Sequence, residues 1–391
     1  MKNFEFYTPT KIFFGQGREN EIGQILSERN AHKVLIVIGK GSVIKSGLLE
    51  RVVCSLNQSK IEYVILQGVR ANPTFDLVRE GIKLVRENNV DYILPIGGGS
   101  VIDTAKCIAV AYDYEGDIRD FNARKVTPTH ALPIGVILTI SAAGSEMSSS
   151  CVIQDDETMM KNGFNSDFNR PAFVIENPEL TYSVSKEQTA YGIVDIAMHS
   201  LERYFYQSEE YELADDIALA VIKNVFDVGL LCFNNPTNYE YRAKIMLDSS
   251  LSHNGITHIG KGFSMPVHQL EHALSGLYPN IAHGLGLAVL WPAWAKYYYK
   301  YDLDKFAKLG EVVFSIHKDD KEKAALETIE RIQKYFDELG MPRTLKALGL
   351  KEKDINSLVE IASRKGTRVI AHHSKDMDEE VMRIIYNSCM C

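Results

Sequence analysis

The stretch DYILPIGGGSVIDTAKCIAVAYDY, residues 91–114, decides the fold of the first half of the chain. Its apolar run YILPI ends in three consecutive glycines, and a segment with helical periodicity follows at once. A short apolar run bounded by glycine is typical of a buried parallel strand. The stretch therefore predicts a strand, a glycine loop and a helix in direct succession, which is the repeating unit of an α/β domain.

Similar apolar runs flank this stretch on both sides. The further candidate strands are VLIVIG (34–39), YVILQGV (63–69), ALPIGVILTI (131–140), FVIENPEL (173–180) and a short two-stranded start in FEFYTPTKIFF (4–14). Helical segments separate most of these runs, and strands that alternate with helices form parallel sheets covered on both faces. We expect a Rossmann-like dinucleotide-binding domain over residues 1–180.

Glycine and hydroxyl residues gather at three predicted strand ends: Gly39-Lys40-Gly41-Ser42, Gly97-Gly98-Gly99-Ser100 and Thr139-Ile140-Ser141. Ligands of such sheets bind beyond the carboxyl ends of the strands, and a glycine loop before a helix suits a pyrophosphate. The G-x-G-x-x-G spacing is absent, so the triple glycine also fits a plain tight turn. The first loop offers a cation and a hydroxyl but no acid, which suits a 2′-phosphate; a surface loop with an incidental lysine fits equally well.

After Thr181 the strand signal ends, and we expect a helical domain over residues 181–391. Ser185 is the predicted N-cap of the helix KEQTAYGIVDIAMHSLERYF. Asp195 and His199 lie four residues apart on it, His268 and His272 repeat that spacing, and His283 opens a third segment. One carboxylate with three imidazoles suits Fe(II) or Zn(II). The same pattern is compatible with ordinary core or surface histidines.

Composition excludes several classes of partner. The chain of 391 residues has a formal net charge of −8, whereas nucleic acids and anionic membranes attract basic surfaces. No apolar run reaches the roughly 18–20 residues that span a bilayer, and the N-terminus lacks the apolar core of a signal peptide. The six cysteines form neither a zinc pattern nor a disulfide framework, which fits a cytoplasmic protein.

Four motifs, in this order, are similar to those of the iron-containing (group III) alcohol dehydrogenases: GGGS-x-x-D-x-x-K (97–106), TISAAGSEMS (139–148), G-x-x-D-x-x-x-H-x-x-E (192–202) and H-x-x-x-H…AHG (268–284). The resemblance covers nearly the whole chain, and the NADP-using butanol dehydrogenase and aldehyde reductase branch is the most similar. It implies a dehydroquinate synthase-like architecture, a homodimer, and reversible hydride transfer between a nicotinamide cofactor and a primary alcohol or aldehyde.

The resemblance also implies roles for individual residues. The metal ligands would be Asp195, His199, His268 and His283. The cofactor would contact Gly39, Lys40, Ser42, Asn72, Gly97, Gly98, Gly99, Ser100, Asp103, Thr139, Ser141 and Lys161. His272 matches a non-ligating histidine beside the nicotinamide, where it either relays a proton or packs behind a ligand. Glu202 either orients a ligand or forms a salt bridge on the helix surface.

Gly39 favours NADP(H) over NAD(H), because some relatives carry at this position an aspartate that excludes NADP. Lys40 departs from the glycine common in NADP-using relatives; it either contacts the phosphate or points to solvent. Two alternatives remain open. One is a glycerol dehydrogenase-like or dehydroquinate synthase-like enzyme. The other is a metal-dependent hydrolase, which leaves the glycine loops unexplained.

Overall fold

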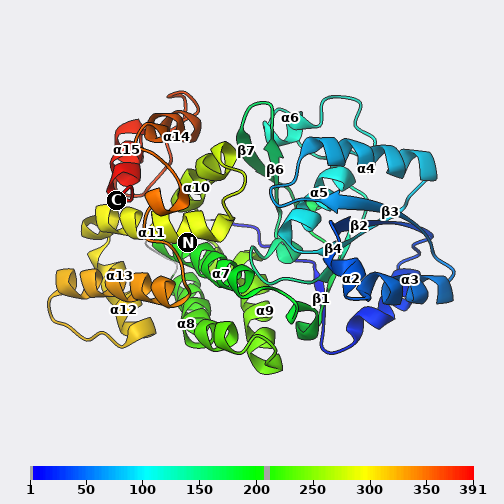
Figure 1. Cartoon of the computed structure of the whole chain (residues 1–391), viewed down its shortest axis with the longest axis horizontal. Helices are drawn as coiled ribbons and strands as arrows, with labels where there is room; N and C mark the ends of the chain where they lie inside the picture. Colours follow the sequence, from blue (N-terminus) through cyan, green and yellow to red (C-terminus); the bar gives the residue numbers. More distant parts are fainter. Residues whose placement is uncertain (1–2, 207–211) are drawn as a thin grey trace. The chain divides into compact units, whose positions relative to one another are not determined.

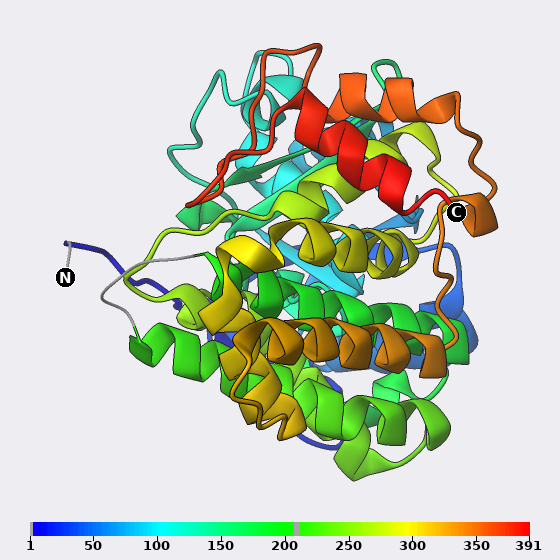
Figure 2. The same ribbon diagram turned by 90° about the vertical axis from the view of Figure 1, so that its left-hand side faces the viewer.

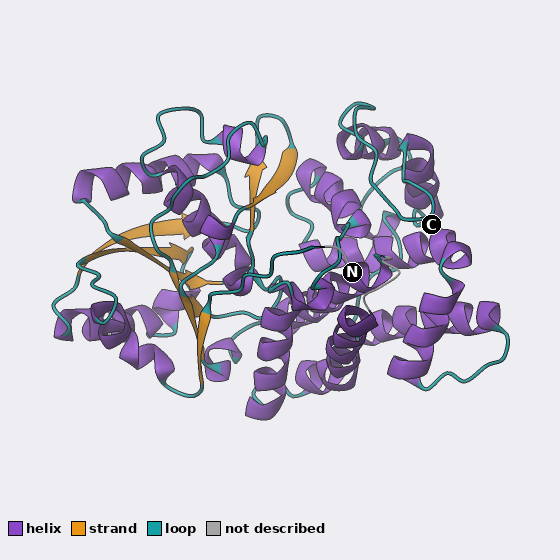
Figure 3. Cartoon of the chain, turned by 180° about the vertical axis from the view of Figure 1, so that it is seen from behind, coloured by secondary structure: helices purple, strands orange, loops and turns teal. Residues whose placement is uncertain are grey.

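The computed structural model describes residues 3–206 and 212–391. The chain forms two compact units: the first is Tyr7–Val184, and the second is Ser185–Cys391 together with the residues before Tyr7. All the strands assigned within these described residues lie in the first unit, and the second is helical (Figure 3). No described helix is long and apolar enough to cross a membrane.

The first unit is built on a parallel six-stranded sheet with the order β1-β8-β5-β4-β2-β3. Its strands are β1 (Lys11–Phe14), β2 (Lys33–Gly39), β3 (Glu62–Val69), β4 (Tyr92–Gly97), β5 (Gly135–Leu138) and β8 (Phe173–Glu176). The helices of the unit are α1 (Ile22–Ser27), α2 (Ser42–Lys45), α3 (Leu48–Gln58), α4 (Phe75–Asn88), α5 (Gly99–Ala111) and α6 (Arg119–Asn122). Figure 1 shows α4 and α5 on one face of the sheet and α2 and α3 on the other. Two covered faces explain why β4 is buried along its whole length.

Two features of this unit differ from the sequence-based expectation. The two-stranded start expected in residues 4–14 is wrong, because only Lys11–Phe14 is a strand and it pairs in parallel with β8. An antiparallel hairpin of β6 (Ser150–Asp155) and β7 (Met160–Asn165) was not expected. Backbone pairing joins it to the loop after β3, since Gln154 donates its N–H to the carbonyl of Pro73 at 2.8 Å.

The second unit contains α7 (Lys186–Phe205), α8 (Glu212–Asn234), α9 (Tyr239–His253), α10 (Pro266–Leu277), α11 (His283–Tyr298), α12 (Leu303–Phe314), α13 (Lys321–Glu338), α14 (Asp354–Ala362) and α15 (Glu379–Ser388). Ser185 caps α7 as predicted, since its side chain accepts the N–H of Gln188 at 3.2 Å. Figure 2 shows α7, α11 and α13 running side by side. A continuous apolar core holds these helices together and includes the fully buried Trp291 and Trp294 of α11.

Candidate metal centre and dinucleotide loops

Four candidate ligands from three helices converge inside the helical unit. Asp195 and His199 lie on α7, His268 lies on α10, and His283 is the first residue of α11. The Oδ1 atom of Asp195 is 3.4 Å from Nε2 of His199, 3.4 Å from Nε2 of His268 and 3.8 Å from Nε2 of His283. Three imidazoles therefore present the same ring nitrogen to one carboxylate oxygen.

The atoms of this cluster fit a divalent metal. Asp195 Oδ1 and His268 Nε2 are buried, and neither has a hydrogen-bond partner among the described residues. Leaving such atoms unpaired costs about 1–3 kcal/mol each, whereas metal coordination would satisfy both. Metal–ligand bonds of about 2.1 Å in tetrahedral geometry place ligand atoms about 3.4 Å apart, close to the spacing observed.

Two buried carboxylates orient the histidines from behind. Oε2 of Glu202 accepts from Nδ1 of His268, and Oε2 of Glu271 accepts from Nδ1 of His283. A hydrogen on Nδ1 leaves the Nε2 lone pair directed at Asp195, an arrangement common around metal-binding histidines. Of the two roles open for Glu202, the surface salt bridge is excluded because its side chain is fully buried. Glu271 was missed, although it is the acidic residue between His268 and His272 in the stretch VHQLEHALSGL.

The protonation tendencies of the histidines differ. Burial lowers the pKa of His268, but the carboxylates of Glu202 and Asp195 outweigh burial and raise it to about 9. Burial, together with the neighbouring His253 and His268, holds the pKa of His199 well below its usual value. A neutral imidazole is the form that binds a metal.

Arg203 sets His199 apart from the other two histidines among the ligand candidates, His268 and His283. Its Nη1 donates to the carbonyl of His199 at 2.6 Å and lies 3.1 Å from Nδ1 of the same residue. Among the described residues, a guanidinium rather than a carboxylate thus faces Nδ1 of this ring. His253 stacks on His199 with ring centroids 4.1 Å apart, a contact that the sequence did not reveal.

His272 lies beside the metal candidates but outside their group. It is half-buried on α10, and its ring centroid is 5.7 Å from that of His283. One ligand-type atom from each of Glu271, His272 and His283 falls within 4.8 Å of the other two. His272 therefore lies next to His283 and Glu271 at the margin of the cluster. A residue that moves protons to or from the cluster would need such a position.

In the first unit, the candidate cofactor residues gather at one edge of the sheet. The loops 39–42, 97–100 and 139–141 follow β2, β4 and β5, which are adjacent parallel strands, and Asn72 follows β3 on the other side of β2. The chain order reverses between β2 and β4, and ligands of doubly wound sheets bind at such a point. Lys40 and Ser42 are exposed there.

The glycines of the 97–100 loop permit a close approach of neighbouring side chains. A Cβ on Gly98 would lie 2.1 Å from a methyl carbon of Ile140, and one on Gly97 would lie 2.6 Å from Val101. The N-cap residue of the 13-residue helix α5 is Gly98, which has no side chain to cap the helix. An uncapped helix N-terminus beside a glycine turn is suited to an anion.

Asp103 and Lys106 of α5, which follow the 97–100 loop, form a buried hydrogen-bond network. Asp103 accepts from Ser145 Oγ at 2.6 Å and from the N–H of Val152 at 3.1 Å, and burial raises its pKa. Lys106 is fully buried and donates to carbonyl and hydroxyl oxygens of Ser145 and Ser148 and to the carbonyl of Ser150. These bonds tie α5 to the segment that leads into β6. Lys161 lies half-buried on β7, paired with Gln154 of β6.

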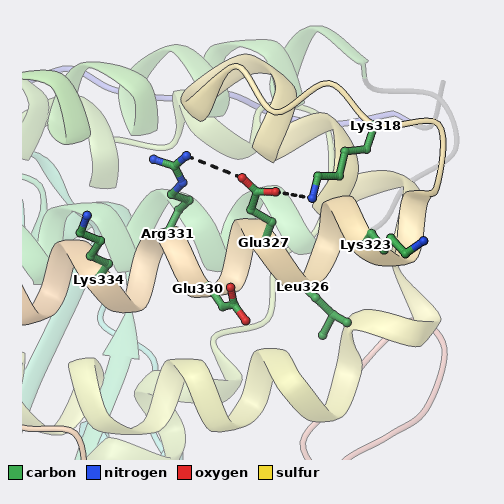
Figure 4. Close-up of a pocket in the computed structure, with 7 residues that line it drawn as sticks. All are labelled: Lys318, Lys323, Leu326, Glu327, Glu330, Arg331 and Lys334. Carbon is green, nitrogen blue, oxygen red and sulfur yellow. Dashed lines mark ion pairs between the residues drawn. The ribbon is translucent and has the colours of Figure 1, made fainter.

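A surface hollow on the helical unit contains none of these residues. Figure 4 shows its lining: Lys318, Lys323, Leu326, Glu327, Glu330, Arg331 and Lys334. Glu327 pairs there with Lys318 at 2.5 Å and with Arg331 at 3.6 Å. Exposed pairs of this kind are worth about 0–1 kcal/mol. We assign no function to the hollow.

Comparison with known families matches both halves of the chain. The family described as "Iron-containing alcohol dehydrogenase" matches residues 9–178. The family described as "Fe-containing alcohol dehydrogenase family, C-terminal" matches residues 189–390.

Individual relatives span the full length. The chain is 38% identical to NADH-dependent butanol dehydrogenase A of Clostridium acetobutylicum, over 99% of this chain and 100% of that protein. It is 30% identical to NADPH-dependent aldehyde reductase YqhD of Escherichia coli, over 99% of this chain and 100% of that protein. A crystal structure of NADH-dependent butanol dehydrogenase A from Thermotoga maritima superposes with a TM-score of 0.95 at 34% identity, covering 100% of this chain and 99% of that one. The predicted α/β plus helical fold is thereby confirmed.

Proposed function

Since the chain belongs to the iron-containing alcohol dehydrogenase family, we propose that it catalyses reversible hydride transfer between NADP(H) and a short primary alcohol or aldehyde of the butanol type. The observation that carries the proposal is the buried convergence of three Nε2 atoms on one oxygen of Asp195. Neither alternative is favoured, because the two full-length relatives described above are named a butanol dehydrogenase and an aldehyde reductase.

The residues that would hold one divalent ion, Fe(II) or Zn(II), are Asp195, His199, His268 and His283. When bound, such an ion supplies a Lewis acid for the oxygen of an alcohol or aldehyde. Glu202 and Glu271 hold two of the imidazoles in the ligand tautomer and so act as positioning residues. His272 is the proposed proton carrier, because it is half-buried, is not one of the proposed ligands, and has a ring nitrogen within 4.8 Å of ligand-type atoms of Glu271 and His283.

For the dinucleotide, we propose the loops at the strand ends. The uncapped N-terminus of α5, with Gly97, Gly98, Gly99 and Ser100, would bind the pyrophosphate. Gly39, Lys40 and Ser42 would face the adenine ribose, with Asn72, Thr139 and Ser141 at neighbouring strand ends and Lys161 on the hairpin. Asp103 would support this loop from behind through its bonds to Ser145 and Val152.

The preference for NADP(H) rests on charge. The exposed loop 39–42 carries a cation and no carboxylate, so a 2′-phosphate would meet attraction rather than repulsion. The relatives are named for either cofactor, NADH in Clostridium acetobutylicum and NADPH in Escherichia coli. Both cofactors therefore belong in the test.

Three further proposals concern organisation. Residues 1–180 would be the dinucleotide-binding domain and residues 181–391 the metal-binding domain. The assembly would be a homodimer, which light scattering after gel filtration measures directly. The six cysteines, all free in the structure, support a cytoplasmic location.

The deciding experiment uses protein purified without oxygen, loaded with Fe(II) or Zn(II). We expect butanal to be reduced with loss of absorbance at about 340 nm, the band of the reduced cofactor, more efficiently with NADPH than with NADH. His268→Ala should lose most of the bound metal and the activity together. Absence of cofactor oxidation with every short aldehyde, combined with metal-dependent phosphatase activity, would overturn the proposal.

A further inference from the structure

A second cluster of a carboxylate and two imidazoles lies in the helical unit, outside the candidate metal centre. Asp302 stands at the start of α12, and His372 and His373 lie between α14 and α15. Nε2 of His373 is 2.6 Å from Oδ1 of Asp302, and Nε2 of His372 is 3.5 Å from Oδ2. One ligand atom from each of the three residues lies within 4.8 Å of the other two.

Asp302 does not cap the helix that it precedes. It is the N-cap residue of α12, where aspartate normally accepts backbone N–H groups, yet its side chain makes no capping bond. The carboxylate is 1% exposed, and its Oδ1 is in close contact with Nε2 of His373, whereas Oδ2 and Nε2 of His372 have no hydrogen-bond partner among the described residues. Burial raises the pKa of Asp302, but the two imidazoles outweigh burial and leave it below its usual value. An ionised, buried carboxylate thus faces the Nε2 atoms of two imidazoles.

The loop that carries the histidines is closed at its base. Ile370 donates to the carbonyl of Met377 at 3.0 Å, and Met377 donates back at 2.9 Å. Within the loop, the N–H of His372 donates to Asp376 at 3.0 Å. The rings of His372 and His373 lie 4.3 Å apart at their centroids. Both imidazoles therefore lie on a short loop whose two ends are hydrogen-bonded to each other.

The ring of His372 is held in a suitable orientation. Tyr298 packs against it with centroids 4.2 Å apart. The N–H of Ser374 donates to Nδ1 at 3.4 Å, and the Oγ of Ser374 lies 2.9 Å from the same nitrogen. These contacts direct Nε2 toward Oδ2 of Asp302 at 3.5 Å, and a metal bound at Nε2 would take the place of its hydrogen.

We propose that Asp302, His372 and His373 bind a second divalent transition-metal ion of the Zn(II) class. One carboxylate and two imidazoles suit such ions better than Mg²⁺ or Ca²⁺, which prefer oxygen ligands alone. The side chain of His373 is 14% exposed, so solvent can supply the remaining ligand. Equal ligand spacing around the ion requires this ring to move outward by about 0.8 Å. The bound ion would fasten the loop between α14 and α15 to the start of α12. This site does not depend on the proposed function.

The test measures Co(II) binding to the whole, metal-depleted protein by equilibrium dialysis with Co(II) chloride, followed by visible absorption. Wild-type protein should bind two ions per chain, and His268→Ala should retain one. Adding Asp302→Asn or His372→Ala/His373→Ala to His268→Ala should abolish that remaining ion. His317→Ala, which removes an exposed imidazole 4.0 Å from Glu311, is the control and should change nothing.

The pattern of Co(II) binding among these variants supports or overturns the proposed site. Co(II) binding that is unchanged by Asp302→Asn and by the double histidine variant overturns the proposal, as does complete loss of Co(II) in His268→Ala. Retention of both ions in His268→Ala contradicts the ligand set of the proposed function and leaves the Asp302 site to be judged by its own variants. Should those variants not fold, anomalous scattering from Zn(II)-soaked wild-type crystals decides, and no peak between Asp302 and the two histidines refutes the site.

Discussion

Replacing Glu202 by glutamine tests whether the carboxylate behind His268 controls metal binding. In the wild type, one oxygen of Glu202 accepts the N–H of Val267 at 2.6 Å, and the other accepts the Nδ1 hydrogen of His268. Glutamine preserves the first bond but turns an NH₂ group toward His268. The imidazole must then accept at Nδ1 and carry its hydrogen on Nε2, where the metal would bind.

The expected loss follows from this tautomer change. Removing the outer partner of a ligating histidine typically weakens metal binding by about 10–100-fold. With about 1.4 kcal/mol for each factor of ten, Glu202→Gln should cost roughly 1.4–2.8 kcal/mol of metal affinity. Glu271→Gln should act similarly through His283, because it makes the equivalent contact. Each glutamine fills nearly the same volume as the glutamate that it replaces, so the packing of α7 against α10 should be preserved.

The assay is competition between the apo protein and a chromophoric chelator for Zn(II), with circular dichroism to confirm folding. Glu330→Gln, on the surface of α13, is the matched control and should leave the Zn(II) affinity unchanged. A folded Glu202→Gln protein with wild-type Zn(II) affinity would refute the reasoning. It would mean that the tautomer of His268 is set by something other than Glu202.

Three further predictions concern other parts of the chain. Lys40→Asp should raise the KM for NADPH about tenfold or more beyond any change for NADH, because a charge-assisted contact is worth about 1.5–3 kcal/mol; equal effects in steady-state kinetics would contradict it. Lys106→Met should lower the free energy of urea unfolding by about 3–5 kcal/mol, because it leaves several buried acceptors without a donor, whereas the exposed Lys83→Met should have little effect. Asp248→Asn should stabilise the protein at pH 8 but not at pH 4. Burial raises the pKa of Asp248 to about 7, so the native state binds the extra proton and stability falls as the pH rises from about 4 to 7, by at most about 4 kcal/mol. Thermal unfolding of the variant and the wild type across this pH range measures this effect. An equal change in Tm at pH 4 and at pH 8 would argue against the raised pKa of Asp248.

Short-range patterns were enough to predict much of the fold. Helical periodicity and the Ser185 cap located α7, because a cap and an apolar stripe involve neighbouring residues only. The apolar run before Gly97 identified β4, since a strand buried on both faces cannot tolerate polar residues. The same local logic failed for the start of the chain: it expected a hairpin in residues 4–14, whereas the strand Lys11–Phe14 pairs with β8 about 160 residues later.

Residue types and spacing alone singled out Asp195, His199, His268, His272 and His283, because the i, i+4 spacing places side chains on one helix face. Only the tertiary structure brought three Nε2 atoms to a single oxygen, since that convergence depends on how α7, α10 and α11 pack. It alone showed Glu271 behind His283 and the buried cation of Lys106 among serine oxygens. A charged residue in a sequence appears the same whether it faces water or fills a cage of acceptors, and only packing decides between the two.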